Sequence, residues 1–566
     1  MLQIISGKFF STAKERYRFE AKGIMYSNFS LIKPIITEVV KLEVADNFSQ
    51  TIASYVMSYV NQIEKDEKSV LLRTGDEEII NQFRLLCIFG LQAYFSPYRD
   101  QVEMNCRDKG RSSDDRYIPS QMVKRFFDNN IVETPEKIDK FVKFVNHIIG
   151  LPRDSFEMIM KCLGNFSNSL QVVNYDMDLA YSMMVYSLES LAQDYDGYDP
   201  VWTDYDRSVA ECLDKELLKI ENDCANNIRN ILLKSSHLKL QKRFVEFTVS
   251  HIKDSFFLDE AIDVQRPIKK SDVRQAMKNA YIMRSKFVHN LKNIQKELKI
   301  PSIAEADTFS WENEIYLTYN GLVRLGHHVI YNFIMEHAIV EKESIDWHSK
   351  LPNIINVELA PEYWIASYKF FRAEDSVKKF QGFLEQIQEA FISQKPITDI
   401  KLLLKKMELM LDQTQYKTDK YKIIMSSIII LFYAIIEPKS EKNKEILRKY
   451  DSNIKTCGIE TLIVGALLLK ALPWSGQECE VVYQEYLEKK YRKNALRIPM
   501  VINVVIIIKI ANKFLIEGNK DKFRCWMKKA VLDLSGIPIV QNLIDEYIVK
   551  EDQLDTDLIF DKIKNT

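Results

Sequence analysis

Arg284 and His289 are the residues of this chain whose types and spacing best suit chemistry. Both lie in the segment Tyr281-Ile-Met-Arg-Ser-Lys-Phe-Val-His-Asn290, near the middle of the sequence. A guanidinium is permanently charged and offers planar donors to an anion. An imidazole titrates near neutral pH and can take or give a proton. The pair therefore combines proton transfer with stabilisation of negative charge.

The residue pattern around this pair predicts one long helix. Ser271 is a suitable N-cap, and apolar residues recur at a spacing of three to four from Val273 to Leu298. Arg284 falls on this apolar stripe, so its charge requires a carboxylate, a phosphate or a partner subunit. At 3.6 residues per turn, Arg284 and His289 are separated by roughly 140° around the helix axis. The two side chains can therefore converge only at the edge of the helix.

Four further residues are candidates for auxiliary roles. Ser285 precedes His289 by one helical turn and could hydrogen-bond its ring, Lys286 lies between Arg284 and His289, and Asn290 follows His289. Ser285 and Lys286 could equally face solvent without a role. Glu189 lies in the apolar segment 177–192 and is a candidate carboxylate partner for the guanidinium. A structural salt bridge with no part in chemistry is an equally good interpretation of Glu189.

Basic residues precede the pair on the same predicted helix. Lys270, Arg274 and Lys278 could guide a phosphate backbone towards the guanidinium, although a solvated helix face has the same pattern. Further basic clusters lie at 234–243 and at 489–493, where solvated helix ends are an alternative.

The spacing of an Arg, four residues and a His resembles the signature of the HEPN superfamily. The sequence Met-Arg-Ser-Lys-Phe-Val-His is most similar to the ApeA-like HEPN branch, whose motif is Arg-Ser-x-x-Val-His followed by a small residue. Asn290 occupies the last position, where glycine is expected. The resemblance covers roughly residues 150–335 and implies a helical bundle with Arg284 and His289 as the catalytic pair.

The family resemblance implies a metal-independent endoribonuclease without a cofactor. The ribose 2′-hydroxyl would attack the adjacent phosphorus, with His289 as general acid or base and Arg284 stabilising the transition state. Because one His cannot be both base and acid in one step, and HEPN proteins are commonly dimeric, we expect a homodimer. The implied substrate is RNA, with tRNA as one candidate.

ApeA-like proteins are associated with abortive infection, so the resemblance also implies anti-phage defence, with a phage-derived trigger or an antitoxin as a possible partner. Two alternatives remain open from the sequence. The first is a catalytically inactive HEPN scaffold that acts as a dimeric interaction protein. The second is the toxin of a toxin–antitoxin pair.

Composition limits the class of protein. The chain has 566 residues with only 16 Gly and 15 Pro, which favours long helices with few turns. Its net charge of −1 excludes a generally basic nucleic-acid coat. The 8 Cys are scattered without zinc spacing and favour reduced thiols in a cytoplasmic protein. The longest apolar runs, 423–436 and 459–469, are shorter than a membrane span, so no membrane association is expected.

The chain is predicted to be mainly α, in three parts. Residues 1–116 are expected to form a small α+β domain that could sense or regulate, with strands at 2–10, 17–26, 36–44, 69–72 and 101–106 and a helix at 78–94. Residues 117–340 are expected to form the HEPN-like helical bundle. Residues 350–566 are expected to form an array of helical hairpins, whose predicted helices are 400–411, 421–436, 459–472, 481–491, 499–516 and 520–534.

Two other features are interpreted without a chemical role. The acidic loop from Asp194 to Asp206 lacks the spacing of a calcium loop, so a solvated loop is the preferred interpretation. His327 and His328 are adjacent and point to different sides of a helix, which makes them poor ligands for one metal. We therefore expect no metal site.

Overall fold

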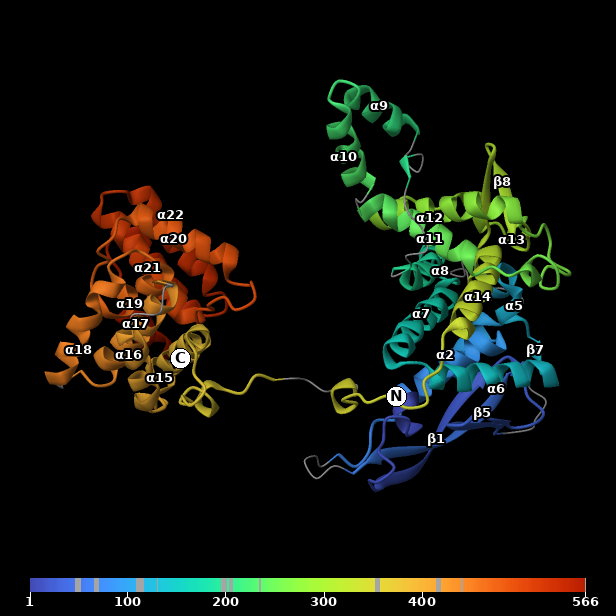
Figure 1. Ribbon diagram of the computed structural model, residues 1–566, viewed down its shortest axis with the longest axis horizontal. Helices are drawn as coiled ribbons and strands as arrows, with labels where there is room; N and C mark the ends of the chain where they lie inside the picture. The colour runs from blue at the N-terminus through green and yellow to red at the C-terminus, as the bar shows by residue number, and fades with distance from the viewer. Residues whose placement is uncertain are drawn as a thin grey trace. The chain divides into compact units, whose positions relative to one another are not determined.

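The computed structural model describes residues 1–45, 52–65, 71–107, 117–129, 131–193, 195, 201–202, 207–233, 236–351, 357–413, 419–438 and 441–564 (Figure 1). They form two compact units, Met1–Ile354 and Ile355–Thr566. The predicted fold class is confirmed, since the chain is mainly helical with a small N-terminal sheet. Most of the loops 107–116 and 194–206, Lys234 and the side chain of Lys239 lie outside the described residues.

The N-terminal sheet is built on two long antiparallel strands. Strand β1 (Arg16–Ser27) pairs with β5 (Ala53–Glu64) along its whole length. The shorter strands β3 (Ile35–Ile36), β4 (Val40–Val44) and β6 (Phe95–Ser96) complete the order β3-β4-β5-β1-β6. Alternate residues face the core, as a half-buried strand requires. The inward side chains include Met25, Tyr55, Met57 and Tyr59.

Two of the predicted N-terminal strands are helical, and the strand predicted at 36–44 is instead the hairpin of β3 and β4. Residues 2–10 contain helix α1 (Leu2–Ile5), all of whose side chains are buried, so no alternation between two faces exists. Residues 101–106 belong to helix α3 (Arg99–Asn105), which buries Val102 and Asn105 at helical spacing. Strand β5 was not predicted, although its apolar residues alternate. Residues 71–72 form no strand.

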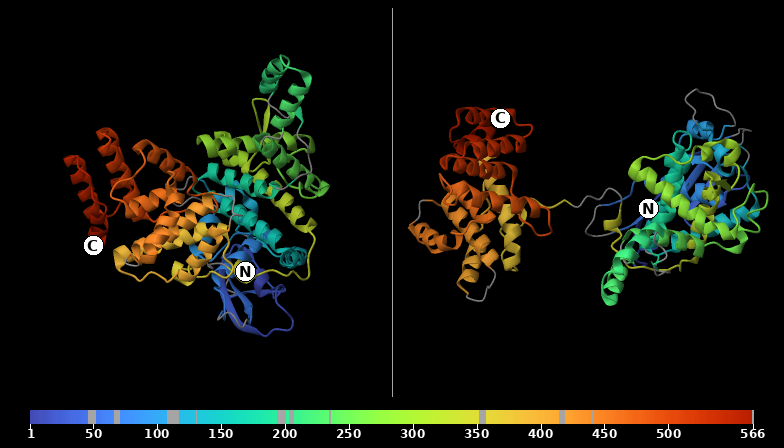
Figure 2. Two further views of the ribbon diagram at one scale, coloured as in Figure 1. Left: turned by 60° about the vertical axis from the view of Figure 1, so that its left-hand side comes forward. Right: turned by 90° about the horizontal axis from the view of Figure 1, so that it is seen from above.

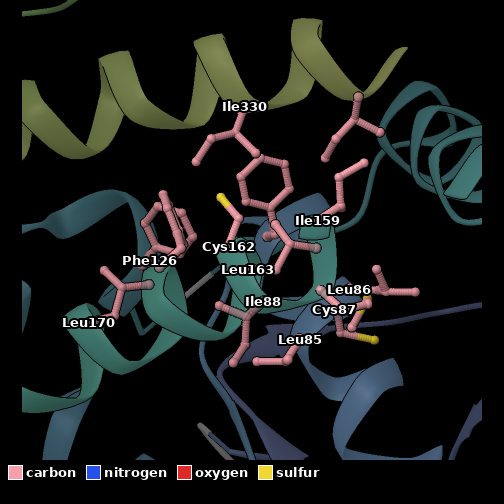
Figure 3. Close-up of a cluster of buried hydrophobic side chains, with 14 of the residues drawn as sticks. Leu85, Leu86, Cys87, Ile88, Phe126, Ile159, Cys162, Leu163, Leu170 and Ile330 are labelled. Carbon is pink, nitrogen blue, oxygen red and sulfur yellow. The ribbon is translucent and has the colours of Figure 1, made fainter. Parts of the chain in front are cut away.

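The sheet and the first helices share one core with the central bundle. The predicted helix at 78–94 is present as α2 (Glu77–Leu91). Figure 3 shows Leu85 and Ile88 of α2 beside Ile159 and Leu163 of α7 (Arg153–Val172), with Ile330 of α14 (Tyr319–Glu336) above them. The buried apolar residues of this cluster extend from Met1 to Leu351. The expected boundary at residue 116 therefore falls inside one compact unit.

The bundle contains the helices that position the candidate site. They are α6 (Pro135–Gly150), α7, α8 (Met177–Ala192), α11 (Ser236–Ser250), α12 (Val273–Asn290) and α14. Helices α9 (Arg207–Leu217) and α10 (Asn222–Leu233) stand away from this bundle (Figures 1 and 2). A hairpin of β8 (Thr308–Trp311) and β9 (Glu314–Leu317) connects α12 to α14.

The second unit is wholly helical in its described residues. Each helix predicted in this unit is present, although some ends are shifted. The helix expected at 459–472 ends at Leu468. The helix expected at 481–491 begins at Gly476, because Ser475 and Glu478 form a capping box there. Its helices are α15 (Ser376–Ser393), α16 (Lys401–Asp412), α17 (Asp419–Ile435), α18 (Glu441–Asp451), α19 (Ile459–Leu468), α20 (Gly476–Lys489), α21 (Met500–Ile516), α22 (Lys520–Asp533), α23 (Pro538–Lys550) and α24 (Asp557–Lys564). In the described parts of both units, every helix is too short or too polar to cross a membrane.

Candidate functional site

Helix α12 carries the Arg284–His289 pair, and its start differs from the prediction. A short 3₁₀ turn, Lys270–Asp272, precedes the helix, so Asp272 rather than Ser271 is the N-cap. The Ser271 hydroxyl lies 3.0 Å from the Asp272 carboxylate and caps no helical amide. The position of Ser271 just before the apolar run was therefore not enough to identify the N-cap of α12.

The end of α12 also differs from the prediction, because the helix does not continue to Leu298. Leu291 adopts a left-handed conformation with φ 52°. Its amide donates to the Phe287 carbonyl at 2.9 Å, and the Lys292 amide donates to the Lys286 carbonyl at 3.2 Å. This pattern closes a helix with a reversal of the chain. The apolar spacing continues beyond the turn because Ile294 and Leu298, in the segment after it, are also buried.

The segment after α12 fastens to the beginning of α8. The Ile294 amide donates to Asp178 Oδ1 at 2.7 Å, and Lys299 Nζ lies 2.5 Å from Asp178 Oδ2. Arg284, ten residues before Ile294, contacts Glu189 at the other end of α8. The two helices are therefore antiparallel, and α8 forms the wall against which Arg284 is placed.

The expected pairing of Arg284 with Glu189 is present. Arg284 Nη2 lies 2.5 Å from Glu189 Oε2, and the two side chains are only 12% and 11% exposed. The guanidinium also lies 5.5 Å from the ring centre of Tyr186 and 5.8 Å from that of Tyr281. These contacts fix the guanidinium in the seam between α8 and α12.

This charge pair leaves donor capacity unused. Arg284 Nε is buried without a hydrogen-bond partner among the described residues, and Glu189 Oε2 contacts Nη2 without hydrogen-bond geometry. Burial raises the pKa of the Glu189 carboxyl, and the Arg284 charge offsets this only in part. The guanidinium is therefore positioned by Glu189, and its buried Nε keeps a donor that the described residues do not use.

His289 lies on the last turn of α12 and is exposed to solvent. Within the described part of the chain, its ring makes no hydrogen bond or ion pair. It is displaced from Arg284 by about 7.5 Å along the helix axis and roughly 140° around it. Arg284 thus faces α8 while the imidazole faces solvent, and a ligand reaching both must lie across the helix edge.

The other predicted site residues contribute unequally. Ser285 is partly buried, Lys286 and Asn290 are exposed, and no hydrogen bond joins Ser285 to His289 in the described chain. Lys270 Nζ lies 3.1 Å from Asp254 Oδ1, and Arg274 forms an ion pair with Glu246. Lys278 is exposed, and its charge acts on Glu314 of β9.

His327 and His328 have different environments, as adjacent helical residues should. His327 is fully buried, its Nε2 lies 3.1 Å from the Phe89 carbonyl oxygen, and burial lowers its pKa to about 3. His328 Nδ1 lies 2.8 Å from Glu260 Oε1, and its Nε2 accepts from the Lys253 amide. Both rings are used to hold the bundle together.

A groove that sequence reasoning did not identify lies beside Arg284. It has a volume of about 710 Å³, and its lining includes Tyr186, His251 and His337. Tyr186 lies on α8, whereas His251 follows α11 and His337 follows α14, so no spacing in the sequence could reveal their proximity. In the same described chain, no cluster of three or more His, Cys, Asp or Glu side chains is arranged to hold a metal ion.

Comparisons of this chain with protein-family models, with curated proteins and with solved structures found no match.

Proposed function

We propose that this chain is a metal-independent endoribonuclease of the HEPN type, with Arg284 and His289 as its catalytic residues. The unsaturated guanidinium of Arg284, held in place by Glu189 on the same helix as the solvent-exposed His289, is the observation that supports this function best. The residue spacing and the local sequence of the motif on α12 resemble those of the HEPN family. RNA is the proposed substrate, with tRNA as one candidate.

The proposed reaction is an internal transesterification. The 2′-hydroxyl oxygen bonds to phosphorus as the bond between phosphorus and the 5′-oxygen breaks. One imidazole removes the 2′-hydroxyl proton, and a protonated imidazole donates a proton to the leaving oxygen. The Arg284 guanidinium stabilises the negative charge that accumulates on the non-bridging oxygens. The products carry a 2′,3′-cyclic phosphate and a 5′-hydroxyl.

Two proton-transfer groups are needed, so we propose a homodimer in which the α12 helices of two copies face each other. The end of α12 supports this arrangement because apolar side chains gather there in solvent: Val288 is 52% exposed and Leu291 is 80% exposed. Burial of such side chains at an interface is favourable. Each subunit would then contribute His289 to one shared cleft.

In the cell, we propose that the nuclease is a regulated cytoplasmic toxin of anti-phage abortive infection, restrained until a phage-derived trigger appears. Alternatively, the same nuclease activity could belong to the toxin of a toxin–antitoxin pair, inhibited by a separate antitoxin protein. The competing class is an inactive HEPN scaffold that mediates dimeric interactions. The charge pairing of Lys270 and Arg274 with carboxylates favours this class, because it reduces the cationic surface beside Arg284.

The deciding experiment incubates purified full-length protein with total RNA in the presence of a chelator. Wild type should cleave and leave cyclic-phosphate ends, whereas His289→Ala should not. Lys292→Ala, a change just beyond the helix end, is the matched control and should cleave like wild type. Absence of cleavage by wild type, with phage lysate added as a source of trigger, would favour the scaffold.

A second experiment tests the dimer separately. Light scattering should give a dimer for wild type and a monomer for a Val288→Asp, Leu291→Asp double variant, which should also lose RNA cleavage. Ile262→Asp, which alters a side chain 69% exposed elsewhere in the first unit, is the control. A cleaving monomer would contradict the shared cleft.

A further inference from the structure

The groove beside Arg284 is formed by four helices of the first unit. Tyr186 and Ser190 come from α8, Lys161 and Asn165 from α7, His251 follows α11, and His337 follows α14. Its volume of about 710 Å³ lies within the usual range of small-ligand sites, about 300–1,000 Å³. Such a space accommodates a nucleotide.

A row of aromatic rings lines one side of the groove. The ring centres of Tyr195 and His251 are 6.2 Å apart, those of His251 and Phe333 are 5.4 Å apart, and those of Phe333 and His337 are 4.3 Å apart. Phe247 supports the row at 4.5 Å from His251. Proteins bind unpaired bases by stacking them on rings of this kind.

The two imidazoles of the row have the same orientation. His251 Nδ1 lies 2.7 Å from the Phe247 carbonyl oxygen, and His337 Nδ1 lies 2.8 Å from the Phe333 carbonyl oxygen. Each Nδ1 must carry the hydrogen to donate to its carbonyl, which leaves Nε2 as an acceptor in the neutral ring. Nε2 of His337 makes no hydrogen bond within the described chain, and Nε2 of His251 lies 3.9 Å from Glu336. The edge of the neutral His337 ring thus offers an acceptor to the amino group of a base, whereas Nε2 of His251 faces the Glu336 carboxylate.

Polar groups of α7 complement the rings. Lys161 supplies an exposed cation for a phosphate, and the Asn165 amide can both donate to and accept from a base edge. Asp154 and Glu157 also line the groove. Glu157 accepts from Arg153 Nε at 2.9 Å, so its charge is compensated within the protein.

Tyr186 connects the groove to the candidate catalytic pair. It lines the groove, and its ring centre lies 5.5 Å from the Arg284 guanidinium. Ser190 and Gln193 continue the groove towards the C-terminal end of α8. The segment following His289 fastens to Asp178 at the opposite end of α8. Along α8, the contact of Arg284 with Glu189 therefore falls within the span from Tyr186 to Gln193 that lines the groove, and the segment after His289 lies towards Asp178.

We propose that this groove binds an unpaired base of single-stranded RNA whose phosphate lies at Arg284. The inference rests on the proposed nuclease function and adds its substrate class, which is single-stranded rather than duplex RNA. A strand that places a phosphate at the guanidinium continues over the Tyr186 ring and stacks its next base in the ring row.

The test measures binding without cleavage. Full-length His289→Ala protein is titrated with a fluorescent single-stranded oligoribonucleotide and with the corresponding duplex. The single strand should bind more tightly, and adding Tyr186→Ala or His337→Ala should weaken it about tenfold, within the range measured for one base stacked on an aromatic side chain. Tyr175→Ala removes a tyrosine that is 58% exposed outside the groove and is the matched control.

A second readout does not depend on substituting the rings. An oligoribonucleotide carrying 4-thiouridine is photo-crosslinked to the His289→Ala protein, and the modified peptides are identified. Crosslinks should map to α7, α8 and the end of α14. Crosslinks confined to other surfaces, equal binding of duplex, or no binding of the single strand would each overturn the groove as an RNA site.

The two proposals fail differently. Wild type that cleaves RNA, with Tyr186→Ala and His337→Ala leaving KM unchanged, would overturn the base-binding groove and leave the nuclease standing. Protein that binds single-stranded RNA in the groove but never produces cyclic-phosphate ends would overturn the nuclease and retain the groove. Capture of a peptide by the groove, with no RNA crosslink, would overturn its assignment to RNA.

Discussion

Helices α12 and α14 each carry an Arg followed by a His within about a turn and a half, and each Arg pairs with a carboxylate, yet the two arginines differ in burial and in how many of their donors are engaged. On α14, Arg324 and its partner Asp307 are 2% and 0% exposed. Arg324 Nε donates to both Asp307 oxygens at 3.1 Å, and Nη1 donates to the carbonyls of Phe256 and Glu260 at 3.1 and 3.4 Å. On α12, Arg284 makes one charge contact and keeps Nε unpaired among the described residues.

The two residues are of the same type, so residue type cannot distinguish them. What differs is how many of the guanidinium N–H donors already have acceptors within the protein. A guanidinium whose donors are all engaged with protein acceptors has no capacity left for a ligand. A guanidinium held by one carboxylate, with donors to spare, can accept a phosphate without losing its position. We therefore assign Arg324 to stability and propose Arg284 for chemistry.

The largest expected effect is on stability at α14. Arg324→Met leaves the fully buried Asp307 carboxylate without its partner and should lower the free energy of unfolding of the first unit by about 3–5 kcal/mol. Chemical denaturation followed by circular dichroism measures it. Arg284→Met is the matched control and should cost clearly less. Equal losses would erase the contrast between the two helices.

The next effect is on chemistry at α12. Arg284→Ala should lower the rate of RNA cleavage by about 10²–10³-fold with little change in stability, because removal of one donor to a developing oxyanion has this magnitude. Arg284→Lys keeps the charge but loses the planar fork, so it should restore only part of the rate. Single-turnover cleavage assays measure both variants. Full activity of Arg284→Ala would refute its catalytic role.

A third effect concerns pH and the buried His327 of α14. Burial lowers its pKa in the folded state to about 3, below the ordinary value of 6.5, so the unfolded chain binds the proton more readily between these values. Stability of the first unit should therefore fall as the pH decreases from 6.5 towards 3. His327→Gln, which can still donate to the Phe89 carbonyl, should flatten this dependence in denaturation curves. An unchanged slope would show that other groups control it.

The smallest effects concern the cations of α12. Lys278→Ala should weaken RNA binding modestly and reduce the slope of log affinity against log salt concentration by about 1, if the side chain contacts a phosphate. Arg274→Ala should change the slope less, because Glu246 already neutralises this charge. Binding titrations at several salt concentrations separate the two. A larger effect of Arg274→Ala would show that its ion pair opens for RNA.

The sequence predicted the helical class and most helices because their apolar spacing is long and regular. It also predicted the partner of Arg284, since an acidic residue on the otherwise apolar α8 needs a cation. The sequence-based prediction was wrong at Leu291, where the apolar pattern continues although the chain changes direction. It was also wrong at Leu2–Ile5, where a short buried helix has the apolar composition expected of a strand.

The groove could not be predicted, because its lining residues come from α7, α8, α11 and α14 and from the residues just after three of these helices, and only the packing of the helices brings them together. For a similar reason, the sequence did not indicate that residue 116 falls inside one compact unit. No local signal reveals that α2 packs on α7 and shares its core.

The single core of the first unit has a consequence for synthesis on the ribosome. Phe10, near the beginning of the chain, packs edge-on against Trp347 with ring centres 5.2 Å apart, so the two extremes of this unit close upon each other. A nascent chain that has emerged only as far as α12 lacks α14 and Trp347 and cannot complete this core. The surroundings of the Arg–His pair would therefore be completed only some time after α12 itself has left the exit tunnel.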